Sequence, residues 1–460
     1  MAKTKESTIY VCQQCGNDSA KWQGRCNYCG EWNSLVEFKP GQSALGKGSS
    51  RLINNDPEEL SKVVTNQADR LVLTLEEINR VLGGGLVKGS VCLLAGEPGI
   101  GKSTLLLQIA SSLQQSQGNV LYISGEESAA QIRLRADRIG ISGESFYLLM
   151  ETNIDGILDH LNSYNPAMVV IDSIQTTRVE DIPSWPGSVS QVRECTQRIT
   201  QWAKASGVPV FISGHVTKGG EIAGPKLLEH MVDVVLYLEG DTTGSFRTIR
   251  GVKNRFGSTN EIGMFEMTGD GLIEIADPSS ILLSEYKQGI IGSIIIPTLE
   301  GSRPILAEIQ ALIDSSMLQT PRRVANGIDF NRMLLVSAVL GQRSNFSIIG
   351  KDIFVSATGG VKISEPAADF GIALSIVSSL KRNPIKLLTS AIGEIGLGGE
   401  IRQVSQIERR INELSRLGFK NCLLPVTSYR KITLEGSNME GNIELIPVST
   451  LSEGIKYALE

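Results

Sequence analysis

This 460-residue sequence has few aromatic residues, few histidines and no large excess of either charge. Aromatic residues make up 5%, there are three histidines, and 44 basic against 49 acidic residues leave a net charge of −5. That balance gives no support to nucleic-acid binding by the surface as a whole. Any such site must therefore be a local patch.

The sequence also lacks the long apolar segments that membranes and secretion require. No uninterrupted apolar run approaches the ~18–20 residues that span a bilayer. The first residues, MAKTKESTIYVC, contain no apolar core of a secretory signal. We therefore expect a cytoplasmic protein that has no membrane partner.

Cysteine is scarce outside one segment. Four of the seven cysteines lie within Cys12–Cys29, and Cys92, Cys195 and Cys422 stand alone in apolar surroundings. A disulfide framework would not be so uneven in a chain of this length. We expect a reduced protein in which the isolated cysteines are small core residues.

The clustered cysteines form two Cys-x-x-Cys pairs ten residues apart, at Cys12, Cys15, Cys26 and Cys29. Two such pairs supply a tetrahedral shell of four thiolates with no open position, which predicts a structural Zn²⁺ rather than redox-active or unpaired thiols. So short a module needs the metal to fold. Trp22, Tyr28 and Trp32 either form its small core, which we favour, or stack on bases or on a partner.

The length predicts two or three domains at ~100–200 residues each. We expect a zinc finger over 1–38, a Gly- and Ser-rich linker over 39–66, and two α/β domains over 67–276 and 277–460. In the first, short apolar runs alternate with helical patterns, which is typical of a largely parallel sheet. Its expected strands are Val91–Ala95, Val120–Ser124, Phe146–Leu149, Met168–Asp172, Pro209–Ser213 and Val232–Leu238; the second domain has strands over Gly292–Pro297, Ala307–Ile313 and Phe354–Ala357 and helices over Arg332–Leu340, Ala367–Leu380 and Gln406–Leu417.

A phosphate-binding loop follows the first of these strands and opens a helical pattern, as a P-loop requires. Its backbone N–H groups and the helix N-terminus would face the phosphates. Lys102 would reach the β- and γ-phosphates and Ser103 would bind Mg²⁺. The loop consists of Gly96, Glu97, Pro98, Gly99, Ile100, Gly101, Lys102, Ser103 and Thr104.

Acidic residues follow two further strands. Asp172 ends the apolar run 168–172, where a carboxylate suits the outer sphere of Mg²⁺ after a P-loop. Glu126 and Glu127 follow the run 120–124, where a carboxylate can polarise the attacking water. We take Glu126 as the first candidate and Glu127 as the second, and the alternative is an exposed acidic pair that starts a helix.

Basic residues and a histidine complete the candidate site. His215 stands at a strand tip, where it either senses the γ-phosphate or is structural, and Lys218 lies in the Gly-rich segment behind it, which can meet a polymer. Lys253 and Arg255 flank one turn. They can supply charge to a neighbouring subunit's γ-phosphate or hold a nucleic-acid backbone, against the alternative of a solvated loop.

The four-Cys module, the loop Gly96–Ser103 and the motif Lys253-Asn-Arg-Phe-Gly257 together resemble the bacterial RadA (Sms) family of DNA repair proteins. The resemblance covers nearly the whole chain and implies a zinc finger, a RecA-like P-loop ATPase and a Lon-protease-like α/β domain. It implies an ATP-driven, helicase-like motor that promotes branch migration in homologous recombination, on single-stranded DNA and beside a RecA-type recombinase. It also implies a homo-oligomeric ring, expected to be hexameric.

The same resemblance assigns roles to individual residues. Glu126 takes the position of the water-activating glutamate and His215 that of the γ-phosphate sensor, while Lys253 or Arg255 acts on the neighbour's nucleotide. Two alternatives stay open. A KaiC-like regulatory ATPase that binds proteins is disfavoured by the zinc finger and the Lys253–Gly257 motif.

The other alternative, an ATP-dependent Lon-type protease, is disfavoured by the missing catalytic pair. Asp369 stands where Lon has its serine nucleophile, and Glu408 where it has its lysine base. A carboxylate cannot replace that serine, so we expect a scaffold without protease activity. Arg322, Arg323 and Arg332 line a DNA-facing surface, as the resemblance suggests, or an ordinary solvated face.

Overall fold

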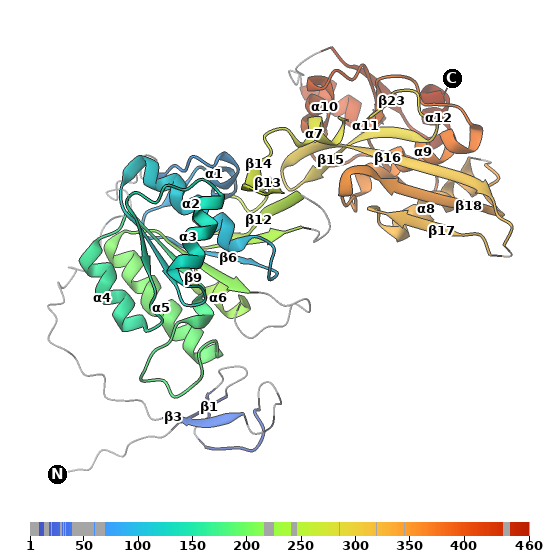
Figure 1. Cartoon of the computed structure of the whole chain (residues 1–460). Coiled ribbons are helices and arrows are strands. Elements are labelled where there is room, and N and C mark those ends of the chain that lie inside the picture. The colour runs from blue at the N-terminus through green and yellow to red at the C-terminus, as the bar shows by residue number, and fades with distance from the viewer. Residues whose placement is uncertain are drawn as a thin grey trace, which may run out of the picture. The chain divides into compact units, whose positions relative to one another are not determined.

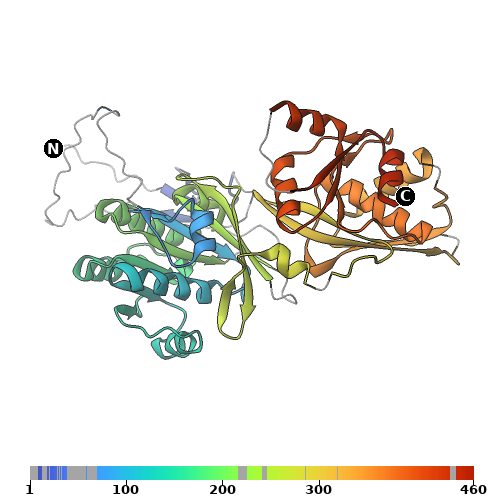
Figure 2. The ribbon, with the colours of Figure 1, turned by 90° about the horizontal axis from the view of Figure 1, so that it is seen from above.

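A computed structural model gives the structure of the chain, which forms two compact units, Met1–Ile275 and Ala276–Glu460 (Figure 1; Figure 2 gives the view from above). The four-segment division expected from the sequence stays a prediction. The structure describes residues 9–12, 18–19, 21–27, 30, 32, 34–38, 59, 70–215, 225–240, 246–284, 286–318, 320–344, 346–435 and 442–459. Within these ranges, no helix has both the length and the apolar character needed to cross a membrane.

The first unit is built on a nine-stranded sheet of order β14-β13-β12-β11-β6-β10-β9-β7-β8. Six neighbouring strands are parallel, and three antiparallel strands extend the sheet beyond β11. The parallel strands are β6 (Val91–Gly96), β7 (Val120–Ser124), β8 (Phe146–Leu149), β9 (Met168–Asp172), β10 (Val210–His215) and β11 (Val234–Glu239); the antiparallel ones are β12 (Phe246–Asn254), β13 (Ile262–Thr268) and β14 (Gly271–Glu274).

Helices cover both faces of this sheet, so strands β6, β7 and β9 are buried at every residue and mostly apolar. One hydrophobic core packs helix residues such as Leu105 and Ile132 against Cys92 and Leu94, and a second packs Val192 against the alternate strand positions. Figure 1 shows the two helical layers. The first layer contains α1 (Glu76–Leu82), α2 (Lys102–Gln117) and α3 (Ala129–Arg138), and the second α4 (Ile154–Tyr164), α5 (Val189–Ser206) and α6 (Pro225–Met231).

The N-terminal module is a three-stranded antiparallel sheet of order β2-β1-β3. Its buried residues include Cys12, Cys26 and Leu35. Trp22 and Trp32 are 56% and 68% exposed, so the expectation that their rings form the core is wrong. Trp22 donates its ring N–H to the Leu35 carbonyl, and the Arg25 guanidinium lies over the ring of Trp32. Tyr28 lies outside the described residues; the strands are β1 (Ile9–Cys12), β2 (Asp18–Ser19) and β3 (Leu35–Phe38).

The second unit contains a seven-stranded mixed sheet of order β17-β18-β16-β15-β19-β22-β23. The hairpin β15–β16 forms its centre. Parallel β19, β22 and β23 continue from β15, and β18 pairs antiparallel with β16 on the other side. The strands are β15 (Ser293–Glu300), β16 (Arg303–Ser315), β17 (Arg323–Asn326), β18 (Lys351–Ala357), β19 (Thr389–Ala391), β22 (Asn421–Pro425) and β23 (Glu444–Val448).

Helices again cover both faces of the sheet, with α8, α9 and α12 on one side and α10 and α11 on the other. Residues 369–379 of α9 are all buried, and a Cβ at Gly371 would stand 2.3 Å from Ile296. The three predicted helices coincide with α8, α9 and α10, whereas α11 and α12 were not predicted. The bounds are α8 (Phe330–Arg343), α9 (Asp369–Lys381), α10 (Ile407–Arg416), α11 (Val426–Glu435) and α12 (Leu451–Leu459).

A fully buried arginine joins α10 to the sheet of the second unit. The Arg410 guanidinium donates to both carboxylate oxygens of Glu365, at 2.7 and 2.5 Å. It also donates to the carbonyl oxygens of Pro297 and Ser405, at 2.8 and 3.1 Å. A buried charge is tolerated only when it is paired and hydrogen-bonded. The Arg410 guanidinium therefore needs all four of these contacts.

We expect Arg410→Ala to destabilise the second unit by ~3–5 kcal/mol, since it leaves the Glu365 carboxylate without its partner. Arg409→Ala is the matched control, because the neighbouring Arg409 is exposed and donates to the Ser302 carbonyl. That change should cost within ~0.5 kcal/mol. Denaturant unfolding of the full chain measures both, and equal destabilisation would contradict the assigned role of Arg410.

Candidate nucleotide and metal sites

The glycine-rich loop leaves the end of β6 and enters α2 at Lys102. Gly101 has a φ of 116°, and a Cβ there would stand 2.5 Å from Met267. A Cβ at Gly96 would stand 2.6 Å from the Leu238 carbonyl oxygen. Glycine is therefore required at Gly96 by the close backbone carbonyl and at Gly101 by the positive φ.

The Lys102 side chain folds back into this loop. Its ammonium donates to the carbonyl oxygens of Gly96 and Glu97, both at 2.9 Å, and the residue is 5% exposed. Burial lowers the pKa of Lys102, while the Asp172 and Glu126 carboxylates oppose that shift. The three predicted residues are thus close enough to interact electrostatically.

Asp172 is held by a hydroxyl group on each side. It ends β9 and is 6% exposed. The Tyr122 hydroxyl, from β7, donates to Oδ2 at 2.7 Å, and the Ser213 hydroxyl, from β10, donates to Oδ1 at 2.5 Å. Neither hydroxyl was foreseen from the sequence, because the pairing depends on the order of the strands in the sheet.

The two adjacent glutamates after β7 differ in their partners. Glu127 forms a bidentate ion pair with Arg135 of α3, with both N–O distances at 2.6 Å. Glu126 accepts a hydrogen bond from the Ser173 hydroxyl, and its carboxylate acts to raise the pKa of Lys102. The structure therefore directs Glu126 toward the loop and Glu127 toward α3.

The end of β10 adjoins the start of the loop. His215 is the last residue of β10 and lies in backbone register with Gly96. Lys218, the other candidate in this region, lies outside the described residues.

Lys253 and Arg255 are both engaged within their own chain. The Lys253 ammonium donates to the carbonyls of Glu229, Val232 and His230, at 2.6, 2.9 and 3.4 Å, and so caps the C-terminus of α6. Arg255 Nη1 lies 3.0 Å from Asp233 Oδ1, with about half of the Arg255 side chain exposed. Burial lowers the pKa of Lys253, and the Arg255 guanidinium adds to that shift.

The rest of this turn is fixed to α1. The Asn254 amide donates to the carbonyls of Val81 and Leu82, at 3.4 and 3.3 Å, at the end of that helix. Arg70, which the sequence gave no reason to single out, donates to the Phe256 carbonyl at 2.7 Å. Residues 253–257 therefore connect the ends of α1 and α6.

In the N-terminal module, Cys12 and Cys26 are 1% and 2% exposed and belong to one small core. Gly30 has a φ of 78° and donates its N–H to the Cys26 carbonyl at 2.9 Å. Cys15 and Cys29 lie outside the described residues, within which no group of three or more ligating side chains is placed to hold a metal. The two buried thiols, each from a Cys-x-x-Cys pair, fit a four-sulfur zinc site.

Three of the candidate residues of the second unit, Arg332, Asp369 and Arg322, are engaged in ion pairs. Arg332 Nε lies 3.1 Å from Asp369 Oδ1, in a pair that is largely buried. Burial raises the pKa of Asp369 to about 7, and Arg332 opposes the rise. Arg322 pairs with Asp352, and Arg323 donates to main-chain carbonyls. Glu408 lies half-buried on α10.

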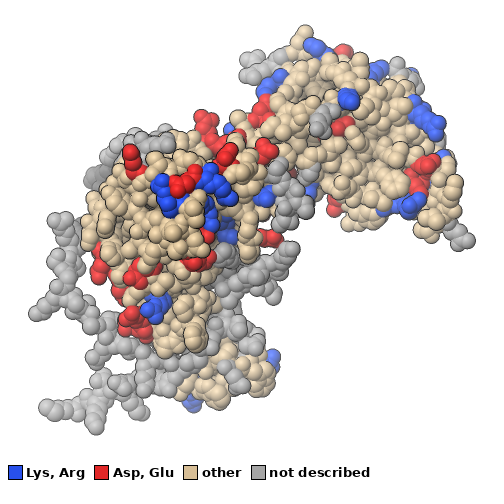
Figure 3. Space-filling model, viewed as in Figure 1, with Lys and Arg blue, Asp and Glu red and all other residues tan. Residues whose placement is uncertain are grey.

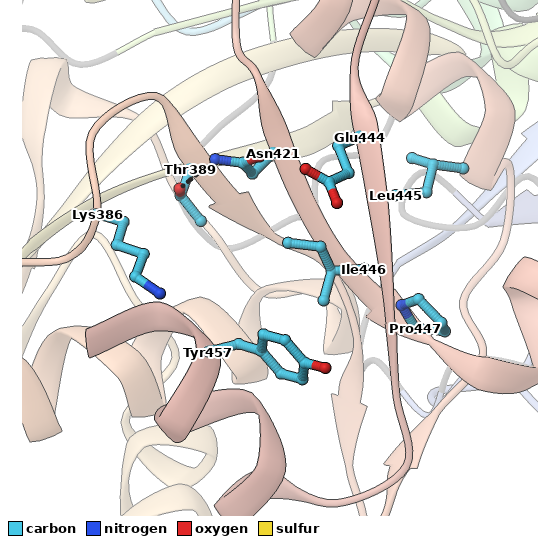
Figure 4. Close-up of a pocket in the computed structure, with 8 residues that line it drawn as sticks. All are labelled: Lys386, Thr389, Asn421, Glu444, Leu445, Ile446, Pro447 and Tyr457. Carbon is cyan, nitrogen blue, oxygen red and sulfur yellow. Dashed lines mark hydrogen bonds between the residues drawn. The ribbon is translucent and has the colours of Figure 1, made fainter. Parts of the chain in front are cut away.

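A cavity of about 360 Å³ lies at one end of the parallel strands of the second unit (Figure 4). Thr389, Asn421 and Glu444, the first residues of β19, β22 and β23, line it together with Lys386 and Tyr457. Figure 3 shows both basic and acidic side chains on the visible face of the molecule.

Comparison with known proteins places this geometry in a family. Three family profiles match in succession: a rubredoxin metal binding domain over residues 10–37, an AAA domain over 55–221 and the Lon protease (S16) C-terminal proteolytic domain over 341–460. The DNA repair protein RadA of Bacillus subtilis (strain 168) is 48% identical over 463 residues, which cover 100% of both chains. The chain belongs to the RadA family.

Other RadA proteins agree with this assignment. That of Listeria monocytogenes is 45% identical over 100% of both chains, and that of Halalkalibacterium halodurans is 46% identical over 99% of both. Among solved structures, a KaiC-like protein from Pyrococcus horikoshii is 20% identical over 45% of this chain and 98% of that chain. Its TM-score is 0.38, too low to carry an argument about function.

The resemblance drawn from the motifs is confirmed, as is the fold: an N-terminal zinc ribbon, a RecA-like ATPase core and a Lon-like α/β domain. For a RadA-family chain, the AAA domain supports ATP hydrolysis and implies a nucleotide with Mg²⁺, and the ribbon implies Zn²⁺. The roles of individual residues stay predictions.

The cysteines separate into two classes that a thiol reagent should distinguish. Burial raises the pKa of Cys92 to about 12 and also raises those of Cys195 and Cys422, so these thiols should not react in the folded chain. We expect four alkylated cysteines per chain after zinc is removed by a chelator and all seven in denaturant. Mass spectrometry assigns the sites, and Cys92→Ala serves as a control that should leave the count of four unchanged. Rapid labelling of Cys195 in the native chain would contradict this.

Proposed function

We propose that the chain is a DNA-dependent ATPase of the cytoplasm, which acts in DNA repair and homologous recombination by driving branch migration and helicase-like processing on single-stranded DNA. The observation that carries the proposal is the gathering of Lys102, Asp172 and Glu126 beside the P-loop, in a chain similar over its full length to DNA repair proteins. The expected partners are branched recombination intermediates and a RecA-type recombinase.

The residues of the loop would act together on the nucleotide. Backbone N–H groups between Gly96 and Thr104 bind phosphate oxygens at the start of α2. The Lys102 ammonium exchanges the carbonyls of Gly96 and Glu97 for phosphate oxygens, which as anions are the stronger acceptors. Mg²⁺, when bound, would neutralise phosphate charge. Ser103 would ligate it, and Asp172 would accept hydrogen bonds from its water ligands.

Glu126 would then orient and deprotonate the attacking water, and His215 would respond to the γ-phosphate at the end of β10. Glu127 is a poor candidate for the general base because Arg135 occupies both of its carboxylate oxygens.

We expect Glu126→Gln to lower kcat for ATP at least 100-fold while nucleotide binding is kept, since general-base catalysis typically contributes 10²–10⁴-fold. Glu127→Gln should keep kcat within about threefold, because its carboxylate contacts α3 rather than the nucleotide. Steady-state turnover and a fluorescent-nucleotide titration separate the two effects. The reverse ranking would make Glu127 the base.

The contacts of the turn 253–257 suggest different roles for its two cations. Lys253 uses its ammonium to cap α6, so we propose a positioning role for it. Arg255 uses Nη1 on Asp233 and presents a half-exposed guanidinium, so we propose that it reaches the γ-phosphate bound to a neighbouring subunit. This requires a ring, which we propose to be hexameric, and Lys218, Arg322 and Arg323 are its candidate contacts to DNA.

A mixing experiment tests this action between subunits. Lys102→Ala and Arg255→Ala chains should each be inactive alone. In random mixed rings made from equal amounts, about one site in four pairs an intact P-loop with an intact neighbouring Arg255, so turnover should recover to about a quarter of the normal rate. Lys253→Ala serves as a control. Because Lys253 caps α6, we expect its loss to lower the stability of the chain. No recovery on mixing would place Arg255 in its own chain's site.

ATP turnover with and without single-stranded DNA tests the proposal as a whole. We expect stimulation that weakens with rising salt, because contacts to the phosphate backbone release counterions. A rate that is indifferent to DNA, together with ATP-dependent degradation of casein, would favour a Lon-type protease instead. Because Asp369 is paired with Arg332 and cannot serve as that nucleophile, we propose that the second unit is a scaffold without protease activity.

A further inference from the structure

A buried tyrosine lies beside the acidic end of β9. Tyr122 is the third residue of β7, is 0% exposed and lies in register with Val170 of β9. Asp172 is two residues beyond Val170, so its side chain is on the same face of the sheet. This diagonal arrangement allows the Tyr122 hydroxyl to donate to Asp172 Oδ2 at 2.7 Å.

The second carboxylate oxygen is held from the opposite side. Ser213 of β10 is 0% exposed and donates to Oδ1 at 2.5 Å. A carboxylate has about four lone-pair sites, so one hydroxyl on each oxygen leaves sites for water ligands of a metal. With donors from both neighbouring strands, the plane of the Asp172 carboxylate is fixed.

We propose that Tyr122 is a positioning residue for ATP hydrolysis, whose hydroxyl orients the Asp172 carboxylate toward the water shell of Mg²⁺ and so sets the affinity of the site for the metal. The inference rests on the proposed role of Asp172 and goes beyond it. It assigns a role to a tyrosine that belongs to no sequence motif of the site. Side chains that hydrogen-bond to metal-binding groups govern metal affinity in many sites.

The hydroxyl is the one polar group of the Tyr122 side chain and serves to hold Asp172. The aromatic ring has a separate task, because it stacks on Phe146 with 6.0 Å between ring centroids and belongs to the core between the sheet and α2. Tyr122→Phe therefore removes the hydroxyl and keeps the packing.

The test measures metal affinity directly, without turnover. Mn²⁺ is titrated into the full chain with bound ADP and followed by electron paramagnetic resonance. We expect Tyr122→Phe to weaken Mn²⁺ binding about tenfold and Ser213→Ala to act in the same direction. The Mg²⁺ concentration that gives half-maximal ATP turnover should rise by about the same factor, with kcat at saturating Mg²⁺ near the normal value.

Tyr237→Phe is the matched control. Tyr237 is on β11 of the same sheet, and its hydroxyl donates to a carboxylate of α6, Glu229 Oε1, at 3.1 Å. This variant should leave Mn²⁺ affinity unchanged. Thermal unfolding should show that Tyr122→Phe and Tyr237→Phe are both folded, with melting temperatures within about 4 °C of the parent chain.

Asp172→Asn separates failure of the inference from failure of the proposed function. If Asp172→Asn weakens Mn²⁺ binding and folded Tyr122→Phe does not, the role of Tyr122 is overturned and that of Asp172 stands. If Asp172→Asn has no effect, the proposed metal role of Asp172 fails, and the inference fails with it. A Mn²⁺ shift in Tyr122→Phe supports the inference whether or not DNA stimulates turnover.

Discussion

The first unit depends on one constraint: parallel strands end at the same edge of their sheet, so the charges that follow them must coexist there. The Lys102 ammonium lies at this edge under the influence of Asp172 and Glu126, with little water around it. Helices cover both faces, which leaves the edge as the place where polar chemistry can gather. Hydroxyl donors from β7 and β10 then fix the carboxylate without adding charge.

The turn after β12 lies at the opposite edge of the sheet, where β6 and β11 begin, beside the ends of two helices. Lys253 holds the end of α6 and Asn254 the end of α1, while Asp233 bonds both Arg255 and the first residue of β6. A displacement of α6 would therefore move Lys253 and the turn that contains it. Under the proposed action of Arg255 on a neighbouring chain, such a displacement would change how Arg255 is presented to that chain.

Much of the fold and of the candidate site was predictable from patterns within short segments of the sequence. The P-loop and the strands around Lys102 and Asp172 were readable because apolar runs and glycine spacing are properties of short segments. The partners of Asp172 were not, since Tyr122 and Ser213 are far from it in sequence and meet it through strand order. The contact of Arg70 with the Phe256 carbonyl joins residues that are likewise far apart in sequence. The role of Arg410 was not predicted either, because its partners Pro297 and Glu365 are far from it in sequence. The tryptophans of the N-terminal module were misjudged because aromatic character alone does not distinguish an interior ring from one covered by a cation.

The central claim, that the edge at which Lys102 lies is an ATP-hydrolysing site, is tested most directly by a crystal structure of the chain with ADP, beryllium fluoride and Mg²⁺. The account predicts that the Lys102 ammonium leaves the carbonyls of Gly96 and Glu97 for the phosphate groups. It also predicts that Asp172 and Glu126 each lie within about 3 Å of an ordered water, one on the metal and one in line for attack. A complex in which Lys102 keeps its carbonyl contacts and Glu126 faces away from the nucleotide would contradict it.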